Sequence, residues 1–283
     1  MLRADVVDLI VKLALREDVG RKDITCSALF SDKLTIRAEI LAKETGVLCG
    51  VEVAERVFRH VDEDLRFLPA AKDGDILEAE REIAYIEGSA TSILVAERTA
   101  LNFLGHLSGI ATFTRHFVDK VSGTNARILD TRKTTPNLRL LEKDAVAAGG
   151  GVNHRMGLYD QVLIKDNHLR VLKDRSIPNI VETVRETVLK KTVVGIEVKN
   201  LKELAEALKT SASYILLDNM NPETVREAVK LREKAKSKIP FEVSGAVWID
   251  NVREYAEAGV ERISIGELTH SAPWLDISLD IVG

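Results

Sequence analysis

The sequence predicts an α/β protein in which an α+β amino-terminal part precedes a parallel sheet. After Gly123, six short apolar runs alternate with amphipathic segments, and this alternation is typical of parallel strands joined by helices. Before Gly123, helical and strand patterns are mixed without regular alternation, which is typical of an α+β arrangement. Periodicity alone leaves open whether the parallel sheet forms a barrel or a doubly wound sheet.

The amino-terminal part is expected to begin with an amphipathic helix whose apolar residues are Val6, Leu9, Ile10 and Leu13. The further elements expected there are a strand over 34–40, a helix over 51–60 and a strand after residue 74. A long helix from Ala96 to Leu107, which Gly109 is expected to interrupt, is the candidate connector between the domains.

The later strands are expected at 127–130, 162–164, 193–198, 214–217, 241–243 and 262–265. Helix start signals lie between them. Asn200 precedes a helical segment as an N-cap residue does, and Asn221-Pro222 places proline in a first turn.

Composition and charge narrow the class of protein. The 283 residues are 45% hydrophobic and 30% charged, enough to bury a core in one or two domains. A formal net charge of -4 argues against a general nucleic-acid-coating protein. The amino-terminus has no apolar signal core, and no uncharged stretch approaches the ~20 residues of a membrane span. The only two cysteines, Cys26 and Cys49, are too few for a disulfide framework, which fits a reducing compartment. Taken together, cysteine content, charge and hydropathy predict a cytoplasmic protein with no membrane or nucleic-acid partner.

A polar or small residue stands at the end of each predicted strand of the parallel sheet. These residues are, in strand order, Thr131-Arg132-Lys133, Lys165, Glu197, Asp218, Ser244-Gly245 and Gly266. The carboxyl ends of parallel strands meet on one face, where ligands bind. A single such residue could simply mark where polar sequence begins, but six together predict a ligand site.

Five potential cations fall within this site. They are Arg132, Lys133, His154, Arg155 and Lys165. Like charges repel one another unless anions neutralise them, and guanidinium groups match carboxylates and phosphates. The expected ligand therefore carries several negative charges. Arg139, on the following helix, is expected on a solvated face outside the site.

Glu197 and Asp218 are the acids of the site, and such oxygen ligands hold Mg²⁺ together with substrate phosphates and water. Two alternatives remain open for them: a salt bridge to Lys165 or Lys199, and a glycosidase carboxylate pair, which the nearby cations disfavour. Small residues at 244–246 and at Gly266 let backbone amides approach a phosphate.

Several other catalytic motifs are absent. The glycine-rich segment 149–157 is neither a Walker A loop nor a GxGxxG fingerprint, and the sequence has no Gly-x-Ser-x-Gly or His-Glu-x-x-His motif. Three histidines, His60, His106 and His116, are expected to be ordinary helix residues, whereas His168 and His270 follow strand ends.

Long stretches of the chain resemble the quinolinate phosphoribosyltransferase (decarboxylating) family, also called nicotinate-nucleotide pyrophosphorylase. The motifs that carry the resemblance are Leu129-Asp130-Thr131-Arg132-Lys133-Thr134-Thr135-Pro136, Gly149-Gly150-Gly151-Val152-Asn153-His154-Arg155-Met156-Gly157-Leu158 and Leu163-Ile164-Lys165-Asp166-Asn167-His168. Shorter similar stretches are 15–20, 96–102, 217–220 and 268–271, so the resemblance extends across nearly the whole chain.

The resemblance implies an incomplete six-stranded parallel α/β barrel over 104–266. It also implies an α+β domain over 1–103, to which the carboxyl-terminal segment 267–283 is added. It implies a homodimer or an assembly of dimers. It also implies a reaction in de novo NAD biosynthesis: quinolinate and phosphoribosyl pyrophosphate give nicotinate mononucleotide, pyrophosphate and CO₂, with Mg²⁺.

The resemblance further implies a role for each site residue. Lys133, Glu197 and Asp218 would be catalytic, and the two acids would bind the ribose hydroxyls and the magnesium complex, the metal directly or through substrate and water. The residues that would hold the carboxylates of quinolinate are Arg132, His154, Arg155 and Lys165, with Arg98 contributed by the neighbouring subunit. Thr131 and Lys133 would also bind substrate. The residues that would hold the phosphate end are Ser244, Gly245, Ala246 and Gly266, with His270 nearby.

The chain departs from the family pattern at three positions. Asn137 and Ala246 stand where glycine is usual, and Glu267 stands where a small residue is usual. Two alternative functions stay open at this point: the related protein encoded with molybdate transporters, and a catalytically silent protein that binds a phosphorylated metabolite.

Overall fold

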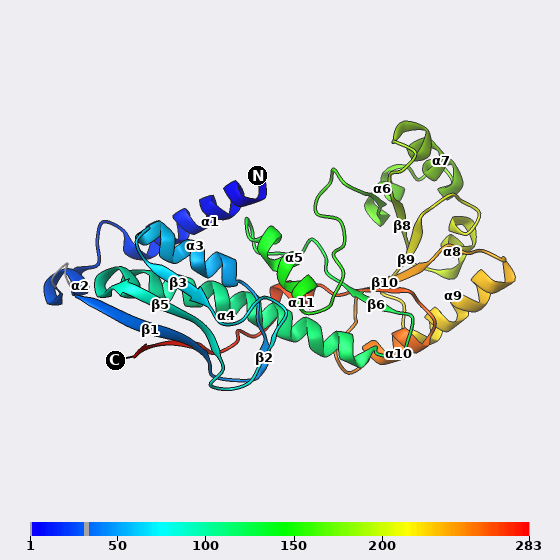
Figure 1. Cartoon of the computed structure of the whole chain (residues 1–283). Helices are drawn as coiled ribbons and strands as arrows, with labels where there is room; N and C mark the ends of the chain where they lie inside the picture. The colour runs from blue at the N-terminus through cyan, green and yellow to red at the C-terminus, as the bar shows by residue number, and fades with distance from the viewer. Residues whose placement is uncertain (1, 31–33, 283) are drawn as a thin grey trace. The chain divides into compact units, whose positions relative to one another are not determined.

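The computed structural model describes residues 2–30 and 34–282 (Figure 1). Its contacts divide the chain into two compact units, the first made of Met1–Arg115, Thr135–Gly150 and Leu268–Gly283, and the second of His116–Thr134 and Gly151–Glu267. The first unit therefore contains more of the chain than the domain over 1–103 that the sequence predicts, even with the carboxyl-terminal segment included. The additional parts are the middle of α4 (Ala90–Lys120), which runs on as one helix, and the segment that contains α5 (Arg139–Ala148).

The first unit is built on a four-stranded antiparallel sheet in the order β12-β1-β5-β3. Its strands are β1 (Thr35–Ala42), β3 (Arg66–Pro69), β5 (Glu82–Ser89) and β12 (Ile277–Val282), with a separate pair β2 (Gly46–Val47) and β4 (Ile76–Leu77). The helices of this unit include α1 (Leu2–Val19), α2 (Ile24–Leu29) and α3 (Val51–Val61). Because β12 pairs with β1, the carboxyl-terminal segment completes the amino-terminal sheet.

The apolar face of α1 differs from the expected one. The buried residues are Val7, Ile10, Val11 and Leu15, and only Ile10 belongs to the predicted set. Leu9 and Leu13 are 58% and 55% exposed, and Val6 is 44% exposed. The helix is apolar on two adjoining faces, of which the first unit buries one.

Gly109 does not interrupt the long helix, so that expectation is wrong. The helix α4 is continuous from Ala90 to Lys120, and a Cβ atom at Gly109 would lie 2.1 Å from the carbonyl oxygen of Pro273. The glycine is needed because the carboxyl-terminal segment passes against the helix backbone there, and a side chain would block that approach.

The second unit contains a six-stranded parallel sheet in the order β6-β11-β10-β9-β8-β7. The strands are β6 (Arg127–Leu129), β7 (Val162–Ile164), β8 (Val194–Val198), β9 (Tyr214–Asp218), β10 (Phe241–Ser244) and β11 (Arg262–Ser264). The connecting helices are α6 (Asp166–Val171), α7 (Ile177–Thr187), α8 (Leu201–Ala207), α9 (Pro222–Lys234) and α10 (Val252–Glu257), and α11 (Glu267–His270) follows β11. Among the described residues β6 and β7 form no ladder with each other, so the sheet is not closed. The predicted α/β class and its six parallel strands are confirmed.

The strand register arranges the side chains on one face of this sheet in layers. Leu163, Gly195 and Tyr214 are register partners, and two residues further along the strands Glu197 and Glu242 both pair with Leu216. The next layer contains Asp218, Ser244 and Ser264. Alternate residues of a strand share a face, so Glu242 lies on the same face as Ser244, one layer further from the carboxyl ends. The polar side chains at the strand ends therefore extend into the interior of the sheet.

Helices α8 and α9 begin where the sequence predicts. The side chain of Asn200 accepts from the backbone amide of Glu203, and that of Asn221 accepts from Thr224. Among the described helices, none is long and apolar enough to cross a membrane.

Candidate functional site

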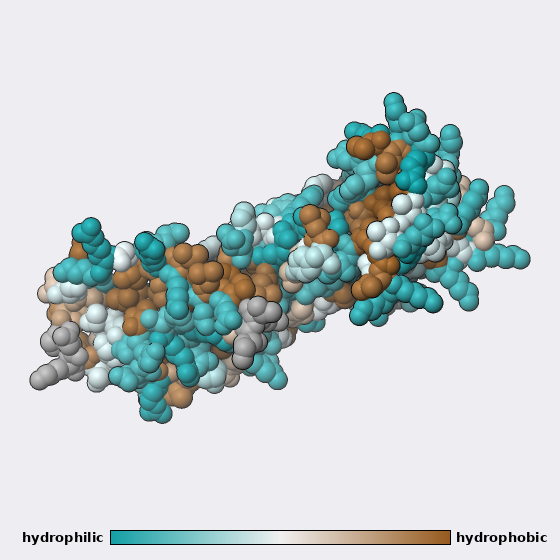
Figure 2. All heavy atoms as spheres, turned by 90° about the horizontal axis from the view of Figure 1, so that it is seen from above, coloured by the Kyte–Doolittle hydropathy of each residue, from teal (hydrophilic) through white to brown (hydrophobic). Residues whose placement is uncertain are grey.

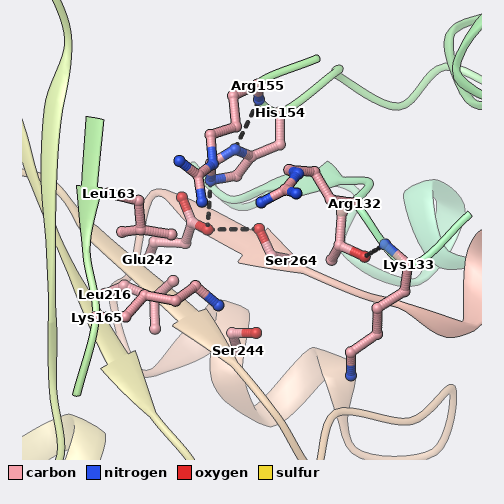
Figure 3. A pocket seen from close by; sticks show the side chains of 11 residues that line it. Arg132, Lys133, His154, Arg155, Leu163, Lys165, Leu216, Glu242, Ser244 and Ser264 are labelled. Atoms are coloured by element: carbon pink, nitrogen blue, oxygen red, sulfur yellow. Dashed lines mark hydrogen bonds and ion pairs between the residues drawn. The ribbon is translucent and has the colours of Figure 1, made fainter. Parts of the chain in front are cut away.

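A cavity of about 320 Å³ opens in the second unit beside the strand ends (Figure 3). Its lining residues are Thr131, Arg132, Lys133, His154, Arg155, Leu163, Lys165, Leu216, Glu242, Ser244 and Ser264. Residues 131–133 follow β6, His154 and Arg155 come from the glycine-rich segment before β7, and Lys165 follows β7. Seven of the residues expected at the site from sequence therefore lie around one cavity: Thr131, Arg132, Lys133, His154, Arg155, Lys165 and Ser244.

The other expected residues lie outside this lining, so far as the described chain shows. Glu197 and Asp218 stand at the ends of neighbouring strands β8 and β9, and Gly245 and Ala246 follow Ser244 directly. Gly266 follows β11, whereas Arg98 and His270 are exposed residues of the first unit.

The cavity is strongly basic on one side. The side chains of Arg132 and Arg155 face the same space in Figure 3, and Arg155 is only 6% exposed. Burial, together with the positive charge of Arg132, lowers the pKa of Arg155 below its ordinary value. Arg155 Nη1 donates to the carbonyl oxygen of Gln161 at 3.3 Å, a contact that does not neutralise its charge. An anion in the cavity would neutralise this pair of like charges.

A fully buried carboxylate lies beneath the cations. Glu242 is in the middle of β10, and its Oε1 accepts from Ser264 Oγ at 2.6 Å, while its Oε2 accepts from Arg262 Nε at 2.7 Å. Burial by itself raises the pKa of Glu242, but the contacts with His154, Arg262 and Ser264 outweigh it and bring that pKa below its ordinary value. The carboxylate is therefore ionised and is held by His154 and by two residues of β11.

Sequence reasoning missed this carboxylate and its partners Tyr214, Arg262 and Ser264. The available signal was Glu242 itself, an acidic residue at the centre of the apolar run Phe241–Val243. A charged residue in a buried strand needs paired groups around it, so its position predicts a polar interior.

His154 occupies the junction between this carboxylate and the cations. Its Nε2 lies 3.2 Å from Glu242 Oε1 and 3.2 Å from the Tyr214 hydroxyl, and its Nδ1 accepts the backbone N–H of Arg155 at 2.7 Å. The Tyr214 ring meets the imidazole edge-on, with the ring centres 5.9 Å apart. Burial, with the nearby charge of Glu242, raises the pKa of the Tyr214 hydroxyl above its ordinary value, so it stays protonated.

The two acids of the site act on one another. Burial, and then the negative charge of Asp218, raise the pKa of Glu197 above its ordinary value, although Lys165 Nζ lies 3.8 Å from Glu197 Oε2. Lys165 is about half exposed, so water screens this ion pair. Lys199 pairs instead with Asp166, at 2.7 Å. Of the salt bridges considered from sequence, the one between Lys165 and Glu197 is present.

These acids suit a magnesium ion that arrives with a phosphorylated substrate. Among the described residues, no three His, Cys, Asp or Glu side chains form a cluster able to hold a metal ion unaided. Mg²⁺ commonly binds through one or two carboxylates, with substrate phosphates and water completing its shell. The mutual repulsion of Glu197 and Asp218 is the kind of charge that a divalent cation relieves.

The backbone after β10 turns sharply through two successive left-handed residues. Gly245 has φ +83° and Ala246 has φ +51°, and a Cβ atom at Gly245 would lie 2.2 Å from Asn219 Oδ1. Glycine is required at the first position, and alanine is strained at the second. Asn137, the other departure from the family pattern, also takes a left-handed backbone, at φ +68°, which asparagine tolerates.

Comparison with known proteins identifies the family. The family model described as the C-terminal domain of quinolinate phosphoribosyl transferase matches residues 110–280, and the N-terminal domain model matches residues 23–108. The chain belongs to the quinolinate phosphoribosyl transferase family. The resemblance that the sequence motifs indicate is confirmed.

Individual relatives agree over the full length. The chain is 42% identical to the probable nicotinate-nucleotide pyrophosphorylase (carboxylating) of Methanocaldococcus jannaschii, covering 96% of each chain. It is 40% identical to the corresponding Bacillus subtilis protein, covering 94% of this chain and 90% of that protein. The solved structure of the nicotinate-nucleotide pyrophosphorylase from Francisella tularensis superposes with a TM-score of 0.91 at 36% identity, covering 98% of this chain and 96% of that chain.

The family also fixes the reaction. The chain is a phosphoribosyltransferase that uses quinolinate and produces nicotinate mononucleotide in NAD biosynthesis. The enzyme class expected from sequence is confirmed with it.

Proposed function

We propose that the cavity beside the strand ends is the quinolinate site and that its cations hold the two carboxylates of this pyridine. The pair Arg132 and Arg155 carries this proposal, because two guanidinium groups that face one cavity, one of them nearly buried, match the carboxylates of an anionic ligand. Lys165, which lies below the two arginines in Figure 3, supplies a third positive charge to the cavity. Leu163 and Leu216 provide apolar surface for the faces of the ring.

The phosphoribosyl pyrophosphate lies, in this proposal, along the carboxyl ends of β8 to β11. Asp218 and Glu197 face the ribose hydroxyls, and they hold the magnesium complex directly or through substrate and water. A Mg²⁺ ion held there would supply positive charge for the leaving pyrophosphate. The turn that contains Ser244, Gly245 and Ala246, together with Gly266, holds the phosphate end through backbone amides, with His270 nearby.

The chain's own groups act mainly by placing charge. Breaking the bond between ribose C1 and pyrophosphate develops positive, oxocarbenium character on the sugar, and the carboxylates Glu197 and Asp218 stabilise it. Lys133, whose backbone N–H donates to Thr131 Oγ1 at 3.0 Å, stands beside the reacting groups as a positive charge for the leaving phosphates. No covalent enzyme intermediate is needed.

The order of the two steps follows from the chemistry of the ring. Loss of CO₂ next to the ring nitrogen leaves an electron pair on carbon, which a positively charged pyridinium stabilises until that carbon takes up a proton. The nitrogen gains that charge when it is bonded to ribose, so ribosyl transfer precedes decarboxylation. The cations of the cavity hold the carboxylate that stays on the product.

The working assembly is proposed to be a homodimer, or a set of dimers, in which Arg98 reaches the partner's site. Two observations within the first unit support an interface. Leu9 and Leu13 are exposed on α1, and Trp274 is 57% exposed beside Arg98. Brown, hydrophobic residues interrupt the teal surface of this unit in Figure 2. A second subunit would cover such exposed apolar side chains.

We place the protein in the cytoplasm. Cys26 and Cys49 are both free and buried, and burial raises the pKa of each thiol above its ordinary value. Unreactive, unpaired thiols fit a reducing compartment.

Incubating the protein with quinolinate, phosphoribosyl pyrophosphate and Mg²⁺ tests the site assignment, with nicotinate as the control substrate. We expect nicotinate mononucleotide and CO₂ from quinolinate only. Arg132→Lys should raise the KM for quinolinate by roughly tenfold or more, because lysine lacks the bidentate fork. The exposed Lys190→Gln is the matched surface control. An unchanged KM in Arg132→Lys would place the carboxylates elsewhere.

A further inference from the structure

The imidazole of His154 is held at both ring nitrogens by the protein itself. We propose that His154 is neutral, with its proton on Nε2, and acts as a positioning residue for Arg155 rather than as a cation that binds substrate. Glu242 is the second positioning residue, because it fixes the Nε2 side of the ring. This inference rests on the proposed function, in which Arg155 holds a carboxylate of quinolinate.

The contact at Nδ1 sets the tautomer. The donor at this contact is the backbone N–H of Arg155, 2.7 Å away, so Nδ1 must accept through its lone pair. An imidazolium has a proton on both nitrogens and no lone pair to offer, so it cannot make this hydrogen bond. The single ring proton therefore belongs on Nε2, which faces Glu242 Oε1 and the Tyr214 hydroxyl, each at 3.2 Å.

The carboxylate of Glu242 has two partners besides the histidine. Glu242 on β10 pairs with Arg262 from β11 at 2.7 Å and accepts from Ser264 at 2.6 Å. Tyr214 on β9 is uncharged, and on the cavity side the ring adjoins the cations Arg155 and Arg132. A further positive charge would add repulsion to a group of cations that burial already disfavours.

The backbone of this segment is fixed as well. The amide N–H of His154 donates to Asp130 Oδ1 at 2.8 Å, and Asp130 is fully buried at the end of β6. The imidazole thus connects the backbone of Arg155 to the sheet interior at Glu242, and the guanidinium of Arg155 projects from a fixed point into the cavity (Figure 3). Preorganisation of this kind reduces the cost of ordering the arginine when substrate binds.

Nitrogen NMR of ¹⁵N-histidine-labelled protein without substrate reads the tautomer directly. The sequence has six histidines, and the signals lost in His154→Asn identify the pair that belongs to His154. At pH 7 we expect one protonated nitrogen, Nε2, and one unprotonated nitrogen, Nδ1. Two protonated nitrogens would overturn the proposal. Because no substrate is present, this result does not depend on whether the protein acts on quinolinate.

Kinetics of three variants provide a second readout. His154→Gln places an amide N–H₂ group near the Nε2 position and is neutral, whereas His154→Lys keeps a positive charge but cannot accept from the Arg155 amide. We expect the KM for quinolinate to rise in the order Gln, Ala, Lys, with at least about a tenfold difference between Gln and Lys. A lysine variant with a lower KM than the glutamine variant would show that His154 serves as a cation. Thermal melting of each variant shows whether it folds.

Discussion

The Nε2 atom of His154 lies 3.2 Å from Oε1 of Glu242, a contact between a residue of the cavity wall and a carboxylate at the centre of a strand. This contact places a negative charge directly beneath a group of cations. The cavity is therefore supported by a polar interior that also includes Arg262, Ser264 and Tyr214. Such a network orients the groups above it only while each member keeps its partners.

Replacing Glu242 with glutamine should therefore destabilise the folded protein. The variant removes the negative charge next to Arg262 and leaves that guanidinium partly buried without its carboxylate. We expect the free energy of unfolding at pH 7 to fall by about 3 kcal/mol, as for the loss of one partner of a buried ion pair. Urea denaturation measures this change, and Glu227→Gln on an exposed face of α9 is the control. A loss no larger than that of the control would contradict the role given to Glu242.

In the unaltered protein, acid should remove the stabilisation that the Glu242 carboxylate provides. The pKa of Glu242 is lower in the folded protein than the ordinary value of 4.5, because favourable contacts outweigh burial. A carboxylate with a depressed folded pKa stabilises the protein above that ordinary value, and the stabilisation is lost as the pH falls through the folded pKa. Unfolding curves collected below about pH 4.5 should therefore fall more steeply for the unaltered protein than for Glu242→Gln. Parallel curves would show that this carboxyl does not titrate with folding.

An ionised Glu197 should lower the stability of the folded protein, in contrast to Glu242. Burial and the charge of Asp218 raise its pKa in the folded protein, so its ionisation at neutral pH costs stability. Glu197→Gln should raise the stability of the ligand-free protein at pH 7 and reduce kcat by roughly a hundredfold or more. Thermal melting and the quinolinate assay measure the two effects. A variant that is less stable than the unaltered protein would show that the two acids do not repel one another.

The hydroxyl of Tyr214 reaches His154 because residue 195 has no side chain. A Cβ atom at Gly195 would lie 2.2 Å from Cζ of the Tyr214 ring. Gly195→Ala should displace the ring, cost about 1–3 kcal/mol of stability and raise the KM for quinolinate. The double variant Gly195→Ala with Tyr214→Ala should lose less than the sum of the single variants, because the added methyl then has space. Additive losses would place the clash elsewhere.

Relaxing the strained turn after β10 should stabilise the protein. Ala246 has φ +51°, a left-handed backbone that costs an alanine about 1 kcal/mol. Ala246→Gly should raise the free energy of unfolding, with the gain reduced by the greater freedom of glycine in the unfolded chain. Ala235→Gly, at φ -76° after α9, should destabilise by about 0.5–1 kcal/mol and serves as the matched control. A loss of stability in both variants would contradict the strain at Ala246.

The strands of the second unit were predictable because each apolar run is short and bounded by polar residues. The observed strands β6 to β11 differ from the expected ones by at most one residue at either end. The face of α1 was not predictable, since two of its faces are apolar and only tertiary packing selects Val7 and Val11 over Leu9 and Leu13. Gly109 was misinterpreted for a related reason: a glycine that breaks a helix and one that admits a passing chain look alike in sequence.

The cationic part of the site could also be predicted from sequence, whereas the buried polar groups around Glu242 could not. Arg132, Arg155 and Lys165 follow or approach strand ends, where parallel sheets place ligands. The partners of Glu242 come from strands far apart in sequence, and strand order and register bring them together. Sequence presents His154 as one more cation beside the arginines, and the ring contacts on which we base the proposal of a neutral imidazole depend on the fold.

The final prediction concerns Arg98, an exposed residue of the first unit that is proposed to complete the site of a second subunit. Arg98→Ala and Lys133→Ala should each reduce kcat/KM by at least about a hundredfold, because each removes a positive charge from every site of the assembly. When the two variants are mixed and allowed to exchange subunits, half of the dimers become mixed. In each mixed dimer one site lacks both groups and the other has both.

Mixing should therefore restore about one quarter of the activity of the unaltered protein at equal concentrations, since one site in four is complete. Subunit exchange is verified separately with a mass-tagged copy of one variant. Mixing either variant with itself provides the control, and it should restore nothing. If exchange is verified and activity stays at the level of the separate variants, Arg98 and Lys133 belong to the same subunit's site, and the sharing of sites across the dimer is refuted.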